Sequence, residues 1–400
     1  MKFFPTEPYS TESCEMKSIG LLTIHGIKNC GSLLQTYATV RVVSALGYNC
    51  QVIDYLFPSY YHLCHATGDE NGNLGLLKGL LNRLGLLLPL KYIKSRLMRR
   101  KALAWLRGRL GETGLSRSCD RRTIRRLPAY DIYLTGSDQV WNPRYGADDE
   151  TFLLGFTPED AGRVAYAASF GCRELPEQFK RRYGELLRRY NAISVREPSG
   201  VGIVRSVADK AAVAVLDPTL LLQRADYLPL AGSRFRGRRF VFCYVLSYVF
   251  DAGSWVIDLA RTVAKALDAE VIFHGDNRGM LRNARTAGFE VLSGFLPVED
   301  FLECYERAEF VITTSFHGTA FSLNFQKNFY AVLNPNATKD DRVASILDRV
   351  GLANRGVRPG ADLSRVAGDL TVDYGDATAR LAAERESSRR YLENALKGVS

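Results

Sequence analysis

Short apolar strands alternate with helical segments along most of this sequence. An apolar strand at 19–24 runs through a loop at 25–32 into a helical pattern that ends at Gly47, and a second strand follows at 50–55. A strand, a helix and a strand in this order form a parallel βαβ unit, and the loop after its first strand lies at the ligand-binding edge. The chain is therefore expected to be an α/β protein.

The alternation stops for residues 56–129 and then resumes. Strands are predicted at 132–135, 164–168, 193–195, 213–216, 240–246, 270–274, 310–314 and 329–333. Helices are predicted near 176–190, 254–268, 298–308, 317–325, 340–350 and 376–397. A chain of 400 residues exceeds the usual size of one hydrophobic core. We therefore expect two Rossmann-like domains facing each other across a cleft, an architecture called GT-B-like.

The expected boundary lies at 222–238, where an Arg- and Gly-rich stretch precedes a strong strand. The N-terminal Rossmann-like domain then spans 1–222 and carries a basic helical insertion at about 56–129. The C-terminal Rossmann-like domain spans 238–350, and a helical segment follows at 351–400.

The composition is that of a globular protein, with 46% apolar and 24% charged residues. The aliphatic run at 84–90 is too short to span a bilayer, and the N-terminal residues lack the apolar stretch of a secretory signal. The eight cysteines are scattered, with neither a Cys-x-x-Cys pair nor a nearby histidine cluster. We therefore expect a cytoplasmic protein with no metal site and no cofactor.

Positive charge is concentrated in the insertion. The formal net charge is +10, and thirteen Lys or Arg against two acids lie between Lys91 and Arg126, so the rest of the chain is close to neutral. A basic segment with clustered leucines, such as residues 74–126, can contact an anionic membrane at the periphery. The alternative is a helical hairpin that packs its leucines and solvates its arginines. No nucleic-acid module is present, so nucleic acid is not an expected partner.

The stretch FVITTSFHG at 310–318 places His317 at the end of a strand, where the next helix begins. Helix N-terminal amides bind anions, and histidine transfers protons near neutral pH. The amides after Ser315 and at Gly318 belong to the same candidate site. The alternative is that the polar residues only cap the helix and hydrogen-bond the histidine.

Two loops in the first half end in similar polar clusters. Asn29, Gly31 and Gln35 lie around a predicted helix start, where amides can hold an anion or Asn29 can act as a cap. The loop TGSDQVWNP at 135–143 contains polar groups beside a Trp. Asp138 can accept a proton there and Trp141 can stack on a sugar ring, or these residues can cap a turn and fill the core. Ser137 and Gln139 belong to the same candidate site.

Arginine supplies the remaining candidates. Arg196 ends the strand at 193–195, and its planar fork suits a carboxylate or phosphate, although a pair with Glu197 would also explain it. Asp217, in LDPT, is interpreted as a helix start or interdomain turn rather than a catalytic acid. Arg342 precedes an apolar helix and can reach the cleft.

Six segments taken together resemble the polysaccharide pyruvyl transferase family, in order and spacing, over about residues 19–350. They read NCGSLLQTYA at 29–38, YDIYLTGSDQVWNP at 130–143, AASFG at 167–171, SVRE at 194–197, LDPT at 216–219 and TTSFHG at 313–318. Cys30 departs from the aromatic residue that is more usual in this family, and the insertion is poorly covered.

The resemblance implies a GT-B-like enzyme that moves the enolpyruvyl unit of phosphoenolpyruvate onto two hydroxyls of a sugar. The products are a cyclic pyruvate ketal and phosphate. His317, Asp138 and Arg196 are then the expected catalytic residues, with substrate bound by Asn29, Gly31, Gln35, Ser137, Gln139, Trp141, Ser315, Gly318 and Arg342.

The acceptor is expected to be a galactose-type sugar, free or lipid-linked, in surface polysaccharide biosynthesis. Two alternatives stay open. One is a nucleotide-sugar glycosyltransferase of the same architecture, and the other is a carbohydrate- or lipid-binding protein without enzymatic activity.

Overall fold

The computed structural model describes residues 16–56, 88–146, 149–247, 250, 252–336 and 341–399. Their strands form two parallel sheets of six strands each. The first sheet has the order β2 (Asn49–Val52), β1 (Ser18–Leu22), β3 (Ile132–Thr135), β4 (Gly162–Ala168), β5 (Ala192–Val195), β6 (Val213–Ala214). The second has the order β12 (Gly356–Val357), β11 (Phe329–Val332), β10 (Phe310–Thr313), β7 (Phe240–Val245), β8 (Glu270–Gly275), β9 (Glu290–Leu292).

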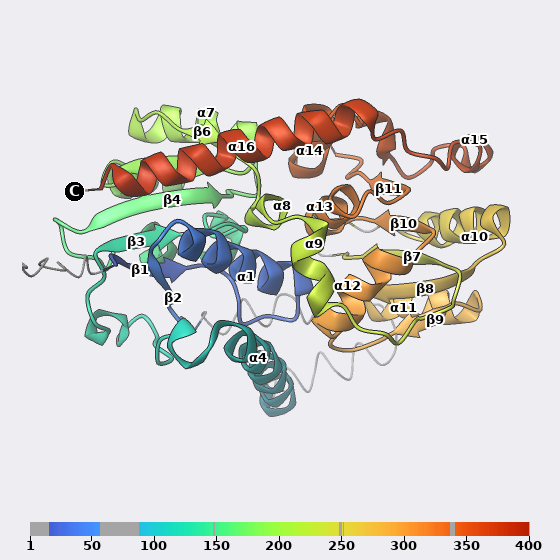
Figure 1. The fold of residues 1–400 in the computed structure, drawn as a ribbon, viewed down its shortest axis with the longest axis horizontal. Helices are drawn as coiled ribbons and strands as arrows, with labels where there is room; N and C mark the ends of the chain where they lie inside the picture. Colours follow the sequence, from blue (N-terminus) through green and yellow to red (C-terminus); the bar gives the residue numbers. More distant parts are fainter. Residues whose placement is uncertain are drawn as a thin grey trace, which may run out of the picture.

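Helices cover both faces of each sheet, so the chain folds into two Rossmann-like α/β domains (Figure 1). The first domain and the connection after it contain α1 (Cys30–Ala45), α4 (Leu88–Leu110), α5 (Pro143–Gly146), α6 (Glu177–Leu187), α7 (Pro198–Ala208), α8 (Pro218–Leu221) and α9 (Arg224–Tyr227). The second half contains α10 (Trp255–Leu267), α11 (Arg278–Thr286), α12 (Val298–Arg307), α13 (Phe316–Asn324), α14 (Arg342–Arg349), α15 (Leu363–Ala367) and α16 (Gly375–Lys397).

The central strands are apolar because they are covered on both sides. All residues of β3, β4, β7 and β10 are buried, as expected for parallel strands between two helical layers. Leu21 of β1 pairs with Val52 on one side and with Leu134 on the other, which fixes the register at the middle of the first sheet. The strands predicted at 132–135, 193–195 and 310–314 are confirmed to within one residue.

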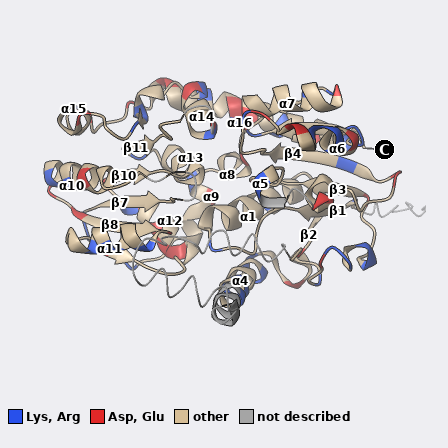
Figure 2. Cartoon of the chain, turned by 180° about the vertical axis from the view of Figure 1, so that it is seen from behind, with Lys and Arg blue, Asp and Glu red and all other residues tan. Residues whose placement is uncertain are grey.

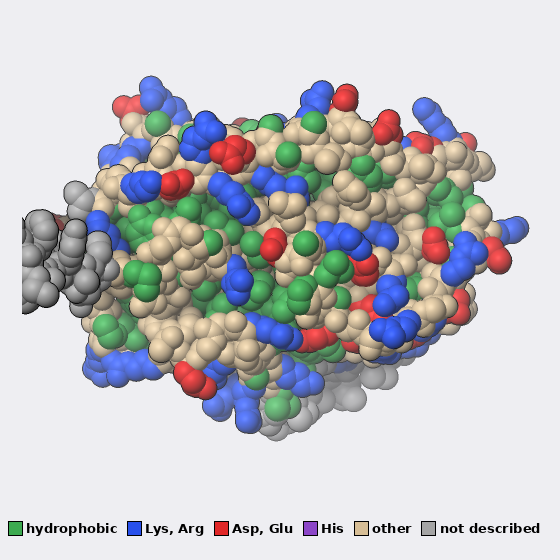
Figure 3. Space-filling view, viewed as in Figure 1, with side chains coloured by type: hydrophobic (Ala, Val, Ile, Leu, Met, Phe, Trp, Pro, Cys, Tyr) green, Lys and Arg blue, Asp and Glu red, His purple; other side chains and the backbone are tan. Residues whose placement is uncertain are grey.

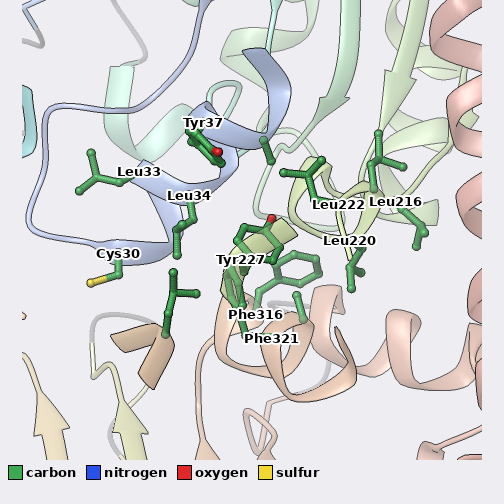
Figure 4. Packing of buried hydrophobic residues seen from close by; sticks show 14 of the residues in the cluster. Cys30, Leu33, Leu34, Tyr37, Leu216, Leu220, Leu222, Tyr227, Phe316 and Phe321 are labelled. Carbon is green, nitrogen blue, oxygen red and sulfur yellow. The ribbon is translucent and has the colours of Figure 1, made fainter. Parts of the chain in front are cut away.

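One hydrophobic core runs through both domains. Figure 4 shows Leu34 and Tyr37 of α1 on one side of Tyr227, with Phe316 and Phe321 of α13 on the other. Tyr227 is fully buried and its ring lies 5.1 Å from that of Phe321. Apolar packing therefore joins the domains next to the strand ends that carry the candidate residues.

Helix α16 spans the two domains along one side of the molecule (Figure 1). Arg385 donates to the carbonyl of Leu220 at 2.6 Å, and the Leu216 amide donates to Ser388 Oγ at 2.9 Å. Beyond the helix, the Val399 carbonyl accepts a hydrogen bond from Lys17 in the first domain. The helix predicted at 376–397 thus fastens residues from opposite ends of the sequence.

The described part of the insertion is dominated by α4. Ala102, Leu103 and Leu106 are buried, and the Trp105 indole N–H donates to Glu299 of α12 at 3.0 Å. Lys and Arg lie on the other face of α4 and on the loops after it (Figure 2). The leucine cluster at 74–87 lies outside the described residues. Within the described ranges, α4 and every other helix lack the length or the apolar character needed to cross a membrane.

Candidate active site

Arg196 lies directly after β5 and reaches the junction between the domains. Its side chain is 3% exposed, and Nη1 donates to Asp217 Oδ2 at 3.0 Å. The guanidinium carbon lies 4.2 Å from the centroid of the Phe316 ring, which belongs to the second domain. Its Nε and Nη2 groups have no hydrogen-bond partner among the described residues. Arg196 is thus a buried cation with two donors available to a ligand.

His317 lies in the first turn of α13, two residues after Ser315, the N-cap residue. The histidine is 4% exposed, and its Nε2 lies 3.6 Å from Asp217 Oδ2, beyond normal hydrogen-bond length. Gly31 of α1 packs against the ring, since a Cβ placed there would lie 2.4 Å from ring atoms. Gly31 and His317, both predicted as site residues, therefore meet across the domain junction.

Asp217 is the charged centre between these two residues. It begins α8, as predicted, because its Oδ1 accepts from the Thr219 amide at 2.9 Å. Its Oδ2 also accepts from Ser137 Oγ at 2.7 Å and from Arg196. Burial alone would raise the pKa of this carboxyl, but His317 and Arg196 together hold the pKa well below its usual value. The interpretation of Asp217 as a helix start is therefore confirmed, and its carboxylate in addition pairs with Arg196.

Asp138 lies at the edge of the same cluster. Its backbone has a φ of 78°, and its Oδ2 accepts from Ser32 Oγ at 2.6 Å. Its Oδ1 accepts from the Gln139 amide at 2.8 Å and lies 3.9 Å from Arg196 Nη2. Both oxygens thus already hold the loop and α1, while the carboxylate adds negative charge beside Arg196.

Glu197 is also part of the site. It was not predicted as a site residue, but only as a structural partner of Arg196. Its Oε1 accepts from Ser169 Oγ at 2.8 Å and from the Phe170 amide at 3.0 Å. Its Oε2 lies 4.0 Å from Arg196 Nε and has no hydrogen-bond partner among described atoms. Burial raises the pKa of this carboxyl against the positive charges of Arg196 and Arg342. The available signal was its position beside Arg196 at a strand end.

Arg342 is brought to this region as predicted, since it is buried and its charge acts on Glu197. It begins α14. Next to it, Asp341 accepts a hydrogen bond from Ser199 Oγ of α7 at 3.1 Å, which links the two domains. The helix start therefore lies over the start of α7 in the first domain.

Several predicted substrate-binding residues hold the backbone of the site. Asn29 caps α1, which begins at Cys30 and thus two residues before the end of the predicted loop. Gln35 is buried and donates to Thr23 Oγ1 at 2.8 Å. Gln139 accepts from Asn142 at 2.7 Å. Gly318 allows close packing, because a Cβ there would lie 2.0 Å from Thr313 Oγ1.

Trp141 does not offer a stacking face for a sugar, contrary to prediction. Its side chain is 1% exposed and its indole N–H donates to the Phe152 carbonyl at 3.0 Å. The ring packs against Phe170 and Tyr190, with centroids at 5.2 and 5.7 Å. The apolar ring gains more from this core than it would at the surface, and its one donor is satisfied there.

The described ranges contain no group of three His, Cys, Asp or Glu side chains that could hold a metal ion. The polar groups brought together from the two domains are instead Arg196, Glu197, Asp217 and His317, with Asp138 at their edge. Such a cluster suits an anionic substrate and proton transfer.

Known structures resemble the chain in fold only. A glycosyltransferase involved in avilamycin A biosynthesis is 12% identical over 96% of this chain and 98% of its own, with a TM-score of 0.48. A UDP-GlcNAc 2-epimerase from Methanocaldococcus jannaschii is 11% identical over 94% and 98%, with a TM-score of 0.47. A spinosyn rhamnosyltransferase is 13% identical over 95% and 100%, with a TM-score of 0.42.

No curated protein sequence is significantly similar to the chain. The family model for polysaccharide pyruvyl transferase, in contrast, matches residues 29–336. The match includes Gly31, Asp138, Arg196, Asp217 and His317. It covers most of the sequence, from the start of α1 to the region before α14, and the chain therefore belongs to the polysaccharide pyruvyl transferase family.

Proposed function

We propose that this enzyme transfers the enolpyruvyl unit of phosphoenolpyruvate onto two hydroxyls of a galactose-type sugar in surface polysaccharide biosynthesis. The observation that carries the proposal is the arrangement of Arg196 and His317 around Asp217. These residues come from two domains, and the side chains of Arg196 and His317 keep buried nitrogen atoms without partners among the described residues.

Phosphoenolpyruvate carries a phosphate and a carboxylate, which need fixed donors in a buried site. Arg196 supplies Nε and Nη2, which together can hold two oxygens of one anion. The first turn of α13 supplies backbone amides, since the first N–H groups of a helix have no partner within it. Donors from both domains then meet at one anion, which favours binding when the domains are in contact.

The reaction adds a proton to the methylene carbon of phosphoenolpyruvate, while the first sugar hydroxyl bonds through oxygen to the neighbouring carbon and loses its proton. The bond from that carbon to the phosphate oxygen breaks, and the second hydroxyl bonds in its place and also loses its proton. One of the two hydroxyl protons is balanced by the new methyl group, and the other leaves with phosphate. His317 is the group that moves these protons, and the Asp217 carboxylate lies 3.6 Å from its Nε2.

The test measures phosphate release from phosphoenolpyruvate with a galactose-type acceptor. We expect His317→Gln to lower kcat at least about 100-fold, the usual contribution of a general acid or base. Arg196→Lys keeps the charge but loses the planar fork, so KM for phosphoenolpyruvate should rise. Arg205→Ala, on the exposed side of α7, is the matched control. A folded His317→Gln variant with near wild-type turnover would refute the role of this residue.

A nucleotide-sugar glycosyltransferase would behave differently in a binding experiment. Calorimetry that detects UDP or GDP, but not phosphoenolpyruvate, would favour that function over ours. Binding of sugar without any turnover would instead favour a carbohydrate-binding protein.

We also propose that the enzyme works in the cytoplasm and contacts the inner membrane face when its acceptor is lipid-linked. Arg100, Lys101 and Arg107 are exposed on α4, and Figure 3 shows Lys and Arg gathered at this edge of the molecule. Replacing all three by Gln should weaken binding to vesicles that contain anionic lipid and leave binding to neutral vesicles unchanged. Equal binding of both proteins to anionic vesicles would remove the support for this contact.

A further inference from the structure

A second charged cluster lies at the carboxyl edge of the first sheet, apart from the His317 site. It is formed by His25 after β1, Asp54 after β2, and Arg99 of α4. His25 Nε2 lies 3.0 Å from Asp54 Oδ1, and Arg99 Nη2 donates to the same oxygen at 2.5 Å. Asp54 Oδ2 also accepts from Ser118 Oγ at 2.5 Å. The insertion thus delivers an arginine into the ligand-binding edge of the sheet.

Hydrogen bonds hold the His25 ring on both sides. Its Nδ1 lies 2.9 Å from the Thr23 carbonyl, and its Nε2 faces Asp54. Burial would raise the pKa of the Asp54 carboxyl, but His25, Arg99 and Ser118 lower the pKa below its usual value. Arg99 thus lies in a buried cluster, beside a carboxylate whose two oxygens already accept hydrogen bonds.

Arg99 has a donor that this cluster does not use. Its Nη1 is buried and has no hydrogen-bond partner in the parts of the chain that the structure describes. The atom faces Gly26, where a Cβ would lie 3.0 Å away. Gly26 therefore lets the loop that leads to Asn29 and Gly31 pack closely against the unused N–H group, where a larger residue would press on it.

We propose that Arg99, His25 and the loop at Gly26 form an anion subsite for a phosphoryl group of the acceptor. This inference rests on the proposed function, and it makes the acceptor a sugar carried on a phosphate or diphosphate. Thr23 and Ser137 lie between the two sites, since Thr23 Oγ1 donates to the Ser137 carbonyl at 2.8 Å and Ser137 bonds Asp217. The subsite is therefore separate from the donors at Arg196, and it binds the second substrate.

The surrounding charge favours a phosphoryl group over a neutral sugar. Burial lowers the pKa of Arg99 against the charge of Asp54, as expected for a cation with too little compensation. A diphosphate oxygen can accept a hydrogen bond from the free Nη1 donor, and its negative charge suits this buried guanidinium. Two sources carry this chemistry, a lipid-linked diphosphate and a nucleotide diphosphate.

The test uses inorganic pyrophosphate as the probe and calorimetry on the full chain. We expect wild type and the Arg205→Gln control to bind equally, and Arg99→Gln to bind at least tenfold more weakly. Gly26→Ala brings a methyl group to 3.0 Å from Nη1 but keeps every charge, so it should also weaken binding tenfold without removing the ion cluster that Arg99→Gln disrupts. Arg196→Gln should keep this binding. Failure of wild type to bind pyrophosphate, or wild-type affinity in Arg99→Gln or in Gly26→Ala, would overturn the proposal.

Two further measurements are needed. The first distinguishes a lipid-linked diphosphate from a nucleotide diphosphate, and the second tests the anion subsite independently of the proposed pyruvyl transfer. A short prenyl diphosphate that competes with pyrophosphate, where UDP does not, assigns the site to a lipid-linked acceptor, and the reverse result assigns it to a nucleotide. Arg99→Gln should raise KM only for acceptors that bear phosphate. If pyrophosphate binding depends on Arg99 while no acceptor supports phosphate release from phosphoenolpyruvate, the proposed function fails and the anion subsite stands.

Discussion

Replacing Gly31 by Ala tests the contact between the two domains at His317. The added Cβ would lie 2.4 Å from the ring, whereas an ordinary contact is 3.4–4 Å. The ring or the domain must therefore shift by about 1 Å, and inserting a methyl group into a packed interior costs about 1–3 kcal/mol. Alanine recovers about 0.5–1 kcal/mol in a helix relative to glycine. The net expectation is a loss between about 0 and about 2.5 kcal/mol.

The effect on activity should exceed the effect on stability. A misplacement of about 1 Å in a catalytic group can cost about 100-fold in rate, so kcat/KM for phosphate release should fall by that order. The free energy of unfolding is measured by urea denaturation, and Gly31→Ala should lower it modestly while the protein stays folded.

Gly202→Ala is the matched control for this experiment. Gly202 lies in α7, and a Cβ there would meet nothing within 4 Å. This variant should gain about 0.5–1 kcal/mol from helix propensity and keep full activity. If Gly31→Ala gains the same stability and keeps the same activity, then Gly31 does not pack against His317 and the described junction is wrong.

Two other substitutions probe the buried groups around this junction. Asp217→Asn removes the one carboxylate that Arg196 hydrogen-bonds among the described residues and should cost about 3–5 kcal/mol in urea unfolding at neutral pH. Because the pKa of Asp217 is lowered in the fold, its stabilisation is present above its ordinary pKa and is lost as the pH falls below about 4. Unfolding free energies measured from about pH 7 down to pH 3 should therefore fall less steeply in Asp217→Asn, and parallel curves would contradict this pKa. Trp141→Phe removes the bond to the Phe152 carbonyl and should cost about 1–3 kcal/mol without changing KM for the sugar, whereas a raised KM in an equally stable protein would restore a sugar-binding role for Trp141.

The sequence predicts most of the fold because buried parallel strands are continuously apolar. The strands at 132–135 and 310–313 can be predicted from the local sequence alone, because every residue in them is buried. The segment between 274 and 298 was not predicted. Helix α11 there carries three arginines and few apolar residues, and β9 is only three residues long. Short and highly charged elements depend on packing that a local pattern does not contain.

Some residues of the candidate site could likewise be predicted from the sequence, and others could not. Arg196 and His317 could be found because each follows an apolar strand, where parallel sheets bind ligands. Asp217 and Glu197 were interpreted locally, as a cap and as a partner of Arg196. Their importance depends on which groups approach from the other domain, and a single segment holds no such information. The prediction that Trp141 stacks on a sugar was wrong for a related reason. The polarity of the neighbouring residues does not show whether the ring points to the surface or into the core.

The path of α16 has a consequence for the order in which the protein is made. Gly162 begins β4 in the first domain, yet Val399 packs against it so closely that a Cβ on Gly162 would lie 2.3 Å from the Val399 side chain. Gly162 and Val399 are far apart in the sequence. At ordinary rates of synthesis, Val399 leaves the ribosome on the order of tens of seconds after Gly162. During that interval the residues of the first domain that α16 and Val399 cover in the folded protein lack this cover. A chaperone that binds exposed apolar residues therefore has a defined time, and a defined surface, on which to act.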